Sequence, residues 1–372
     1  MTMTGTRSDP LTFSIDGASF EVRRSWPGSR GERIFECRDA AGRVRAALLS
    51  PVAGLVVLDH ATDRKLPTLQ SGGELLVHRA GKRAVERTGR GFVKHLRRGK
   101  ADGVAAATRT MGRLAAAAGF AVPEVLAADD CSVTVSTVPG RPLLDLSDRD
   151  WTRAWERWAD LWPRLVTAGP GAGTDGPEPA FGVHDATAEA SVVTTWFGHL
   201  RTFDAGGLAG DLADELAAVE DRACAELLAL SRGTGSAVAE CAADAVPGAE
   251  GADAPPVVAH RDLHDGQMLF CAESDRLGIL DFDTAVLADR ELDLGNLDVH
   301  LDLRVDQEAL SPERARIARS AITRAADAVG ADAHRMAVYR RAARARLVCV
   351  YAFRPQWTGL AARMAGELAN AG

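Results

Sequence analysis

The sequence lacks any apolar run of the roughly 18 residues that a membrane-spanning helix requires. Its longest apolar stretch, from Leu48 to Leu58, is interrupted by Ser50, Pro51 and Gly54. The first ten residues are polar and contain no apolar core of the kind that signal peptides carry. These absences argue against a membrane or secreted protein, and we predict a cytoplasmic protein with no membrane partner.

Closely spaced cysteines and internal repeats are also missing. None of the six cysteines belongs to a C-x-x-C pair, and they are scattered over the chain. Such spacing disfavours both a zinc site and a disulfide framework. What the chain does contain is 46% hydrophobic and 26% charged residues over 372 positions. This composition is ordinary for a soluble globular protein with two or three packed units.

Charge is distributed unevenly along the chain. Residues 1–100 contain 19 lysines and arginines against 10 acids, whereas the remainder contains 25 against 41. A basic front part suits a polyanion such as a nucleotide phosphate, and an acidic remainder suits either a cationic second substrate or simple solvation. The overall charge of −7 argues against a nucleic-acid partner, which requires a basic footprint.

Short apolar runs broken by turn residues dominate the start of the chain. The runs 11–15 and 19–23 flank Asp16-Gly17, which is a strong hairpin signal. Residues 33–38 and 43–49 predict a second hairpin in the same way. We therefore expect an accessory β-rich unit over residues 1–73.

The next segment, residues 74–140, combines strands with one helix. The helix is Ala-rich and ends at Gly119, a residue typical of helix C-termini. Three strands, a helix and two strands predict a compact α+β lobe. The predicted elements are strands at 75–78, 84–87 and 92–96, a helix at 102–118, and strands at 123–126 and 131–136.

The remainder, residues 141–372, is mainly helical. Tryptophans at 151, 155, 158 and 162 recur at steps of three and four, so they lie on one face of a helix. We interpret this face as part of the core, with a wall for substrate stacking as the alternative. Residues 169–180 and 232–256 are rich in Gly, Ala and Pro and predict a loop and a mobile linker. Further helices are predicted over 190–200, 211–230, 311–329, 332–353 and 358–370.

The most informative stretch begins with an apolar strand at Val257. It leads into the run from His260 to His264, which reads H-R-D-L-H, and Gln267 stands five residues after Asp262. Two more strands follow, and the second ends in Asp281-Phe-Asp283.

Phosphoryl transfer requires a metal on the phosphates and an oriented acceptor hydroxyl. A carboxylate on a loop can accept the hydroxyl proton, which suits Asp262. Magnesium prefers hard oxygen ligands and retains several waters, so one or two side chains are sufficient. The amide oxygen of Gln267 and the carboxylate of Asp281 suit the metal.

This pattern resembles the protein-kinase catalytic loop H-R-D-x-x-x-x-N followed by D-F-G. It resembles more closely the aminoglycoside and choline phosphotransferase family, whose loop reads H-G-D-L-H-x-x-N and whose metal strand reads I-D-F/W-x-x-A. Here 280–285 matches the second motif, and 292–296 resembles a further family run in which an aspartate, here Asp293, braces the catalytic loop. The resemblance covers residues 74–300 well and 301–356 loosely.

The resemblance implies a bilobal, protein-kinase-like α+β fold with a β-rich N-lobe and a mainly helical C-lobe, preceded by the extra N-terminal β-rich unit. It implies ATP and Mg²⁺ as cofactors, with Asp262 as the catalytic residue and Gln267 and Asp281 on the metal. Asp283 is either a second metal ligand or a residue that holds the loop. His264 is a family position with either a catalytic role or a role in pinning the loop.

The resemblance also assigns nucleotide contacts to the N-lobe. Lys94, on the third strand, stands where kinase-like proteins keep the lysine that contacts the nucleotide phosphates. Lys82 and Arg83, in a turn with one glycine instead of G-x-G-x-x-G, are candidates for phosphate contact. Ser136 and Val138 follow the fifth strand, where backbone groups of the family's hinge meet adenine.

Three features depart from the family pattern. Gln267 replaces the usual asparagine and is one methylene longer, and Arg261 replaces the usual glycine. No glutamate occurs between residues 101 and 123 to pair with Lys94, so we expect Asp102, Thr108 or a substrate phosphate to hold it.

We therefore predict an ATP-dependent phosphotransferase that acts on a hydroxyl of a small molecule. The acidic helical half suggests a cationic acceptor, such as an amino sugar or an amino alcohol. Two alternatives remain open: a kinase for Ser or Thr in a peptide docked by residues 1–73, and a kinase-like protein that binds a nucleotide or partner without catalysis. The acids that are candidates for contact with a cationic acceptor are Asp265, Asp289, Glu291, Asp293 and Asp298.

Overall fold

The computed structural model describes residues 3–4, 11–70, 72–168, 181–234 and 254–371. The predicted loop at 169–180 and most of the predicted linker at 232–256 lie outside these residues. Within the described ranges, no helix is both long enough and apolar enough to cross a membrane.

The chain begins with a six-stranded antiparallel sheet in which each strand pairs with the next in sequence order. Both predicted hairpins are confirmed, and the first turns at Asp16 and Gly17, which both have positive φ angles. Phe13, Phe20 and Phe35 pack together under this sheet. Its strands are β1 (Met3–Thr4), β2 (Thr12–Ile15), β3 (Ala18–Pro27), β4 (Arg33–Asp39), β5 (Val44–Ser50) and β6 (Gly54–Val57).

The second sheet has five strands in the order β10-β11-β9-β8-β7 and carries one long helix. The predicted succession of three strands, a helix and two strands is confirmed. Helix α1 (Ala101–Ala118) ends at Gly119, which adopts the left-handed conformation expected of a glycine C-cap. The strands are β7 (Glu74–Arg79), β8 (Arg83–Thr88), β9 (Gly91–Leu96), β10 (Val125–Ala128) and β11 (Ser132–Val135).

The tryptophan face of α2 (Asp148–Thr167) belongs to one of two large cores in the helical part. All four tryptophan side chains are buried in one core, and successive rings lie 5.6 Å apart between centroids. The interpretation of this face as core is therefore confirmed. The other long helices are α3 (Ala186–Phe203), α5 (Ala213–Thr234), α7 (Pro312–Val329), α8 (Ala333–Ala352) and α9 (Thr358–Asn370), with a short α4 (Leu208–Asp211) before α5.

Helix α6 (Glu291–Asp306) is an element that the sequence pattern does not predict. Most of its residues are buried, including the acids Glu291 and Asp293, so it has no apolar stripe with a polar opposite face. Helix α8 passes very close to α6 at Gly295. A Cβ added at Gly295 would lie only 2.9 Å from the backbone nitrogen of Arg340. The helix therefore occupies the centre of the helical part.

Two small sheets present the motif residues. One contains β12 (Arg141–Pro142), β15 (Met268–Cys271) and β16 (Arg276–Ile279), and the other contains β13 (Val183–His184), β17 (Val286–Ala288) and β14 (Val257–Ala259). The loop between β14 and β15 holds the H-R-D-L-H run, and the segment after β16 holds Asp281 and Asp283.

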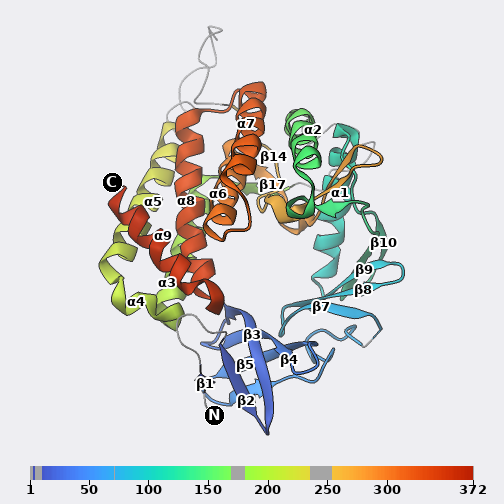
Figure 1. Cartoon of the computed structure of the whole chain (residues 1–372), viewed down its shortest axis with the longest axis vertical. Coiled ribbons are helices and arrows are strands. Elements are labelled where there is room, and N and C mark those ends of the chain that lie inside the picture. Colours follow the sequence, from blue (N-terminus) through green and yellow to red (C-terminus); the bar gives the residue numbers. More distant parts are fainter. Residues whose placement is uncertain (1–2, 5–10, 71, 169–180, 235–253, 372) are drawn as a thin grey trace.

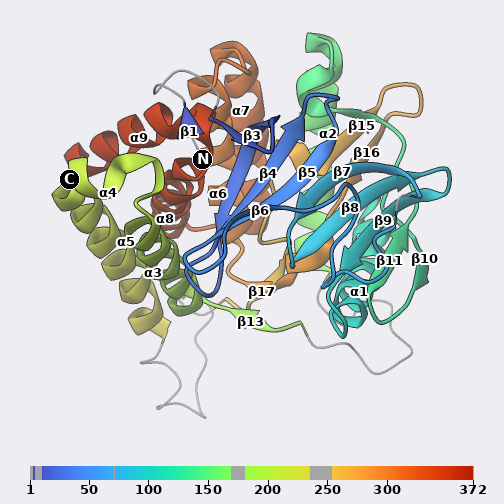
Figure 2. The ribbon, with the colours of Figure 1, turned by 90° about the horizontal axis from the view of Figure 1, so that it is seen from below.

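The first sheet touches both other parts of the chain (Figures 1 and 2). Strands β4 and β5 pack against β7 of the second sheet. On the other side, the backbone nitrogen and the hydroxyl of Ser25 both donate to the carbonyl oxygen of Phe353, at 2.9 and 2.7 Å. Residues 1–73 therefore connect the strand-rich lobe to the end of α8.

The predicted α+β class is confirmed, with two β-rich parts followed by a mainly helical part (Figure 1). The boundaries 1–73, 74–140 and 141–372 remain a prediction as a division into domains.

Candidate active site

The H-R-D-L-H loop is held by hydrogen bonds with α6 and with the segment after β16. The carboxylate of Asp293 on α6 accepts from the backbone nitrogens of His260 and Arg261, at 2.7 and 2.8 Å. The imidazole Nε2 of His260 lies 2.7 Å from the carbonyl oxygen of Leu280, and Thr284 donates to the carbonyl of His260 at 3.0 Å. These bonds join the loop directly to the segment that carries Asp281.

Two motif residues have backbones in the left-handed region, which non-glycine residues rarely adopt. Arg261 has a φ angle of 68° and Asp281 one of 60°. Arg261 stands where the phosphotransferase pattern has glycine, so the glycine-like backbone is kept although the residue differs. Such conformations persist only where the surroundings enforce them, and they concentrate at functional sites.

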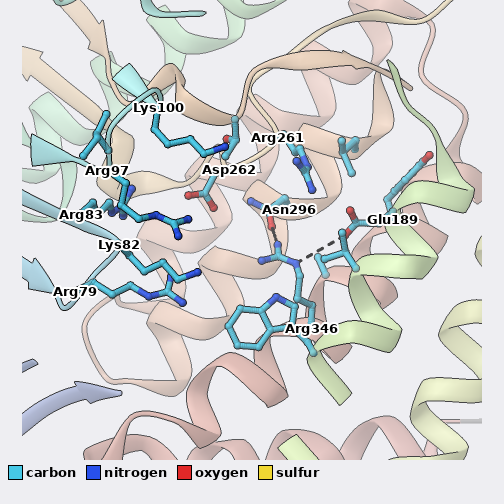
Figure 3. Close-up of a pocket in the computed structure, with 17 residues that line it drawn as sticks. Arg79, Lys82, Arg83, Arg97, Lys100, Glu189, Arg261, Asp262, Asn296 and Arg346 are labelled. Carbon is cyan, nitrogen blue, oxygen red and sulfur yellow. Dashed lines mark hydrogen bonds and ion pairs between the residues drawn. The ribbon is translucent and has the colours of Figure 1, made fainter. Parts of the chain in front are cut away.

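Asp262 lines a cavity of about 480 Å³ between the strand-rich lobe and the helical part (Figure 3). Arg79, Lys82 and Arg83 reach into it from the turn between β7 and β8, while Glu189 on α3 and Arg346 on α8 lie on the opposite side. The carboxylate of Asp262 therefore faces a space large enough for a small molecule.

Lys94 on β9 joins the two lobes through the acids of the second motif. Its ammonium donates to Asp281 at 2.5 Å and to Asp283 at 2.6 Å. Burial opposes ionisation of Asp281, but the charge and hydrogen bond of Lys94, together with the charges of Arg83 and His260, outweigh it, and the pKa of Asp281 lies below its usual value. Burial, reinforced by the nearby charge of Asp281, raises the pKa of Asp283 in spite of Lys94.

This arrangement differs from the expected partners of Lys94 on α1. The hydroxyl of Thr108 donates to the carbonyl of Val104 instead, and no ion pair joins Lys94 to Asp102 among the described residues. Acids from the C-lobe therefore compensate for the missing helix glutamate.

The oxygen atoms of Gln267, Asp281 and Asp283 suit a magnesium ion chemically, since all three are hard ligands. Gln267 ends the turn Asp265–Gln267, and its backbone carbonyl accepts from the nitrogen of Leu280 at 2.9 Å. This bond holds Gln267 beside the segment that carries Asp281. The donor types therefore suit the ion, although Lys94 is bound to one carboxylate oxygen of Asp281 and one of Asp283.

His264 lies outside the lining of the cavity. Its Nδ1 accepts from the backbone nitrogen of Gly266 at 3.0 Å, and its ring stacks on that of His300 with the centroids 4.7 Å apart. These contacts favour the loop-pinning role that the sequence left open beside a catalytic one.

The turn between β7 and β8 is braced from residues 1–73. Asp63 accepts from the backbone nitrogen of Gly81 at 2.6 Å and contacts Nε2 of His78 at 3.3 Å. The guanidinium of Arg79 lies over the ring of Trp26, 5.2 Å from its centroid. The turn that carries Lys82 and Arg83 is thus fixed by groups outside its own lobe.

The hinge candidates lie apart from this cavity. The hydroxyl of Ser136 accepts from the backbone nitrogen of Glu124 at 2.9 Å, and Val138 is buried. The side chain of Val138 packs against Gly278. A Cβ added at Gly278 would lie only 2.5 Å from the Cγ1 of Val138. Neither residue lines the cavity that Asp262 faces.

The structure adds cavity residues that the sequence reasoning missed. Arg97 and Lys100 follow β9, Trp196 comes from α3, and Arg346 comes from α8. Arg346 donates to the side-chain oxygen of Asn296 at 2.7 Å. No local motif marks these positions, because only the fold brings α3 and α8 to the loop.

The acids suggested for a cationic acceptor all have other partners. Asp265 pairs with Arg304 at 3.0 Å, and Asp298 pairs with Arg319 and Arg340. Asp289 binds Arg335 and the hydroxyl of Tyr339, Glu291 accepts from the nitrogen of Asp332, and Asp293 braces the loop. None of these five acids lines the cavity.

A model of the phosphotransferase enzyme family matches residues 76–344, which is more than half of the chain. No curated protein matches the chain in sequence.

Several solved structures are similar to this chain. An aminoglycoside phosphotransferase from Streptomyces rimosus is 21% identical, with 73% of this chain and 92% of that one covered and a TM-score of 0.42. An aminoglycoside-3'-phosphotransferase of type VIII is 21% identical, with coverages of 73% and 93% and a TM-score of 0.47. A glucosamine kinase solved with glucosamine, ADP and inorganic phosphate is 16% identical, with coverages of 100% and 94% and a TM-score of 0.41.

Proposed function

Because the chain belongs to the phosphotransferase enzyme family, we propose that it transfers the γ-phosphoryl group of ATP to a hydroxyl of a small molecule. One observation carries the proposal. The loop of Asp262 and the segment of Asp281 are bonded to each other through His260, and Asp262 faces a cavity between the lobes. An acceptor hydroxyl in this cavity can therefore approach the side chain suited to receive its proton.

In the proposed step, the acceptor oxygen forms a bond to the γ-phosphorus while the bond from that phosphorus to the β–γ bridging oxygen breaks. The bridging oxygen keeps the electron pair and leaves with ADP. The carboxylate of Asp262 takes the hydroxyl proton and releases it to solvent after transfer. The products are ADP and a phosphate monoester.

Gln267, Asp281 and Asp283 would hold magnesium, which neutralises phosphate charge when bound. Lys94, Lys82 and Arg83 would contact the phosphates, and the backbone around Ser136 and Val138 would contact adenine. In this assignment Lys94 turns from the two aspartates toward phosphate when the nucleotide binds. His264 would position the loop and not the reacting atoms.

The central test compares Asp262→Asn with the matched control Asp130→Asn, an exposed acid that pairs with Arg98 away from the cavity. Phosphate transfer is followed as ATP-dependent mass gain over a panel of sugars, amino sugars, polyols, nucleosides and hydroxy-peptides. We expect kcat of Asp262→Asn to fall about 10²- to 10⁴-fold, the range typical of a lost general base. Asp130→Asn should retain the parental rate.

Equal rates in the parent and in Asp262→Asn would contradict the role of Asp262. Nucleotide binding without turnover of any acceptor or of water would instead identify a binding protein of this fold. Preferential transfer to hydroxy-peptides would move the acceptor from small molecules to peptides.

The metal assignment has its own readout. Excess EDTA should abolish transfer, and Asp281→Asn should raise the magnesium concentration needed for half-maximal rate by about tenfold or more, since one charged ligand is lost. Unchanged magnesium dependence in Asp281→Asn would place the ion elsewhere.

A further inference from the structure

The cavity at Asp262 is strongly cationic. Its lining contains seven lysine and arginine residues but only two acids, Glu189 and Asp262. Figure 3 shows basic side chains from both lobes directed toward the same space. The cations are Arg79, Lys82, Arg83, Arg97, Lys100, Arg261 and Arg346.

Most of these cations lack a neutralising partner. In the part of the chain that the structure describes, no ion pair involves Arg79, Lys82, Arg97, Lys100 or Arg261. The Nε of Arg79 is buried without a hydrogen-bond partner. Burial together with the charge of Arg83 lowers the pKa of Arg79 to about 10, and burial with neighbouring cations also lowers the pKa of Lys82.

The two acids of the lining do not offset this charge. Glu189 accepts from Nε2 of His184 at 2.8 Å and lies 3.8 Å from Arg346. Asp262 is assigned to the acceptor hydroxyl. An ammonium group in the cavity would therefore meet repulsion with little compensating attraction, because unpaired cations surround it.

The cavity also extends beyond the groups assigned to the nucleotide. Its lining includes Asp262 but not Lys94, Gln267, Asp281 or Asp283. Lys82 and Arg83 suffice as hairpin contacts to phosphate, whereas Arg346 on α8 lies on the opposite wall (Figure 3). Arg261 and Arg346 thus contribute positive charge to the cavity from the helical part, in addition to the cations of the strand-rich lobe.

We propose that the acceptor is a hydroxyl compound that carries an anionic group, a carboxylate or a phosphate, which the cavity arginines bind while the hydroxyl lies at Asp262. This inference rests on the proposed phosphotransferase function and replaces the cationic acceptor expected from the acidic helical half. Arginine suits this task, since its planar fork can bind carboxylate or phosphate through two hydrogen bonds.

The test uses acceptors matched in scaffold and different in charge. One series is glucuronate, glucose 6-phosphate, glucose and glucosamine, and the other is glycerate, glycerol 3-phosphate, glycerol and 2-amino-1,3-propanediol. We expect the anionic members of at least one series to exceed the neutral member at least tenfold in kcat/KM, with the cationic member slowest. The carboxylate and phosphate members distinguish the two sources of negative charge.

Variants of adjacent arginines sharpen the test. Arg97→Gln removes a cation of the cavity, whereas Arg98→Gln removes its exposed neighbour, which pairs with Asp130 and lies outside the lining. Arg97→Gln and Arg346→Gln should each raise KM for the anionic acceptor about 10- to 100-fold, as expected for one charge-assisted contact. KM for ATP and KM for the neutral acceptor should change little, and Arg98→Gln should match the parent.

Arg346→Lys separates charge from structure, because Arg346 also bonds Asn296. This variant should recover part of the preference for anionic over neutral acceptors. A loss of rate that is equal for glucuronate and glucose would instead indicate a structural role, and would count against the proposal.

Equal or faster transfer to the neutral or cationic members would overturn the inference. If no member is phosphorylated, calorimetric titration of both series into the full chain with ADP measures whether the anionic members bind more tightly than the neutral ones. Anionic members that bind no tighter than neutral ones, or that do not bind, would also overturn it. Failure of the phosphotransferase function is distinct, since ADP binding and ATP turnover dependent on Asp262 would then be absent as well.

Discussion

The two parts of the chain that meet at the cavity treat charge in opposite ways. The wall from the strand-rich lobe presents cations such as Lys82, Arg97 and Lys100, which have no ion pair within the described residues. The helical part contains most of the acids of the chain, yet those near the loop pair with arginines of α6, α7 and α8. The pairing of charged side chains, and not the net charge of a segment, therefore decides which charges a cavity presents to a ligand.

The two walls also differ in what holds them. Hydrogen bonds within the helical part fix the loop of Asp262, above all those of Asp293. The opposite wall depends on residues 1–73, through Asp63 at the turn and Glu36, which accepts from the backbone nitrogen of His78 at 3.0 Å. The accessory sheet is therefore part of the site's support.

The largest effect is expected where the internally braced wall is broken. Asp293→Ala removes the acceptor of two buried backbone nitrogens, and leaving such donors unsatisfied costs about 1–3 kcal/mol each. We expect the free energy of unfolding to fall by about 2–5 kcal/mol. Urea denaturation measures this loss, and kcat should fall with it because the loop of Asp262 loses its support.

Asp130→Ala is the control for Asp293→Ala, since it also removes one aspartate but from an exposed position. Its free energy of unfolding should stay within about 0.5 kcal/mol of the parent. A destabilisation of similar size in both variants would contradict the prediction that the two hydrogen bonds accepted by Asp293 stabilise the fold more than an exposed aspartate does.

A smaller effect is expected at the wall that is braced from outside. Asp63→Asn removes the charge of the carboxylate that contacts Gly81 and His78, while Asp59→Asn changes an exposed aspartate of the same segment between β6 and β7. We expect Asp63→Asn to raise KM for ATP about three- to tenfold, equivalent to about 0.6–1.4 kcal/mol, with kcat less affected. Asp59→Asn should leave KM unchanged.

Hydrogen exchange gives an independent measurement of the same brace. The amides of residues 79–83 should exchange faster in Asp63→Asn than in Asp59→Asn, because local opening of the turn becomes easier. Unchanged exchange at these amides would argue that residues 1–73 do not support the turn.

Much of the fold and of the site could be predicted because the signals are local. Alternating runs around Asp16-Gly17 specify a hairpin, and tryptophans at helical spacing specify a buried face. The H-x-D-L-H and L-D-F-D runs have their chemistry and their spacing in adjacent sequence. Such features need no knowledge of distant contacts.

What could not be predicted depends on long-range packing. Helix α6 is buried on nearly all sides, so it lacks the amphipathic period that identifies a helix. Arg346 reaches the cavity from 84 positions beyond Asp262, and only the fold brings the two together. Lys94 pairs with Asp281 and Asp283 rather than with a residue of α1, because the lobes meet at that point.

A pH-dependent effect is expected at His300, whose ring stacks on that of His264 in the loop of Asp262. His300 on α6 is buried against His264 with its Nδ1 unpartnered, and burial followed by the charges of His264, Arg346, Arg304 and Arg354 holds its pKa well below 6.5. The folded chain therefore keeps His300 neutral, whereas the unfolded chain binds a proton as the pH falls through about 6.5. The free energy of unfolding is therefore unaffected by this proton well above that pH, and it falls progressively below it.

His300→Phe should weaken the pH dependence of stability, because the imidazole of His300 is no longer present to bind a proton on unfolding. Between pH 7 and pH 5 the free energy of unfolding of the parent should fall more steeply than that of the variant, by up to about 1.4 kcal/mol per pH unit, the limit for one proton. Urea denaturation across this range measures both slopes, with His334→Gln, an exposed imidazole near the start of α8, as the control. Parallel slopes for the parent and His300→Phe would contradict the prediction, because they would mean that His300 binds a proton equally well in the folded and unfolded chain.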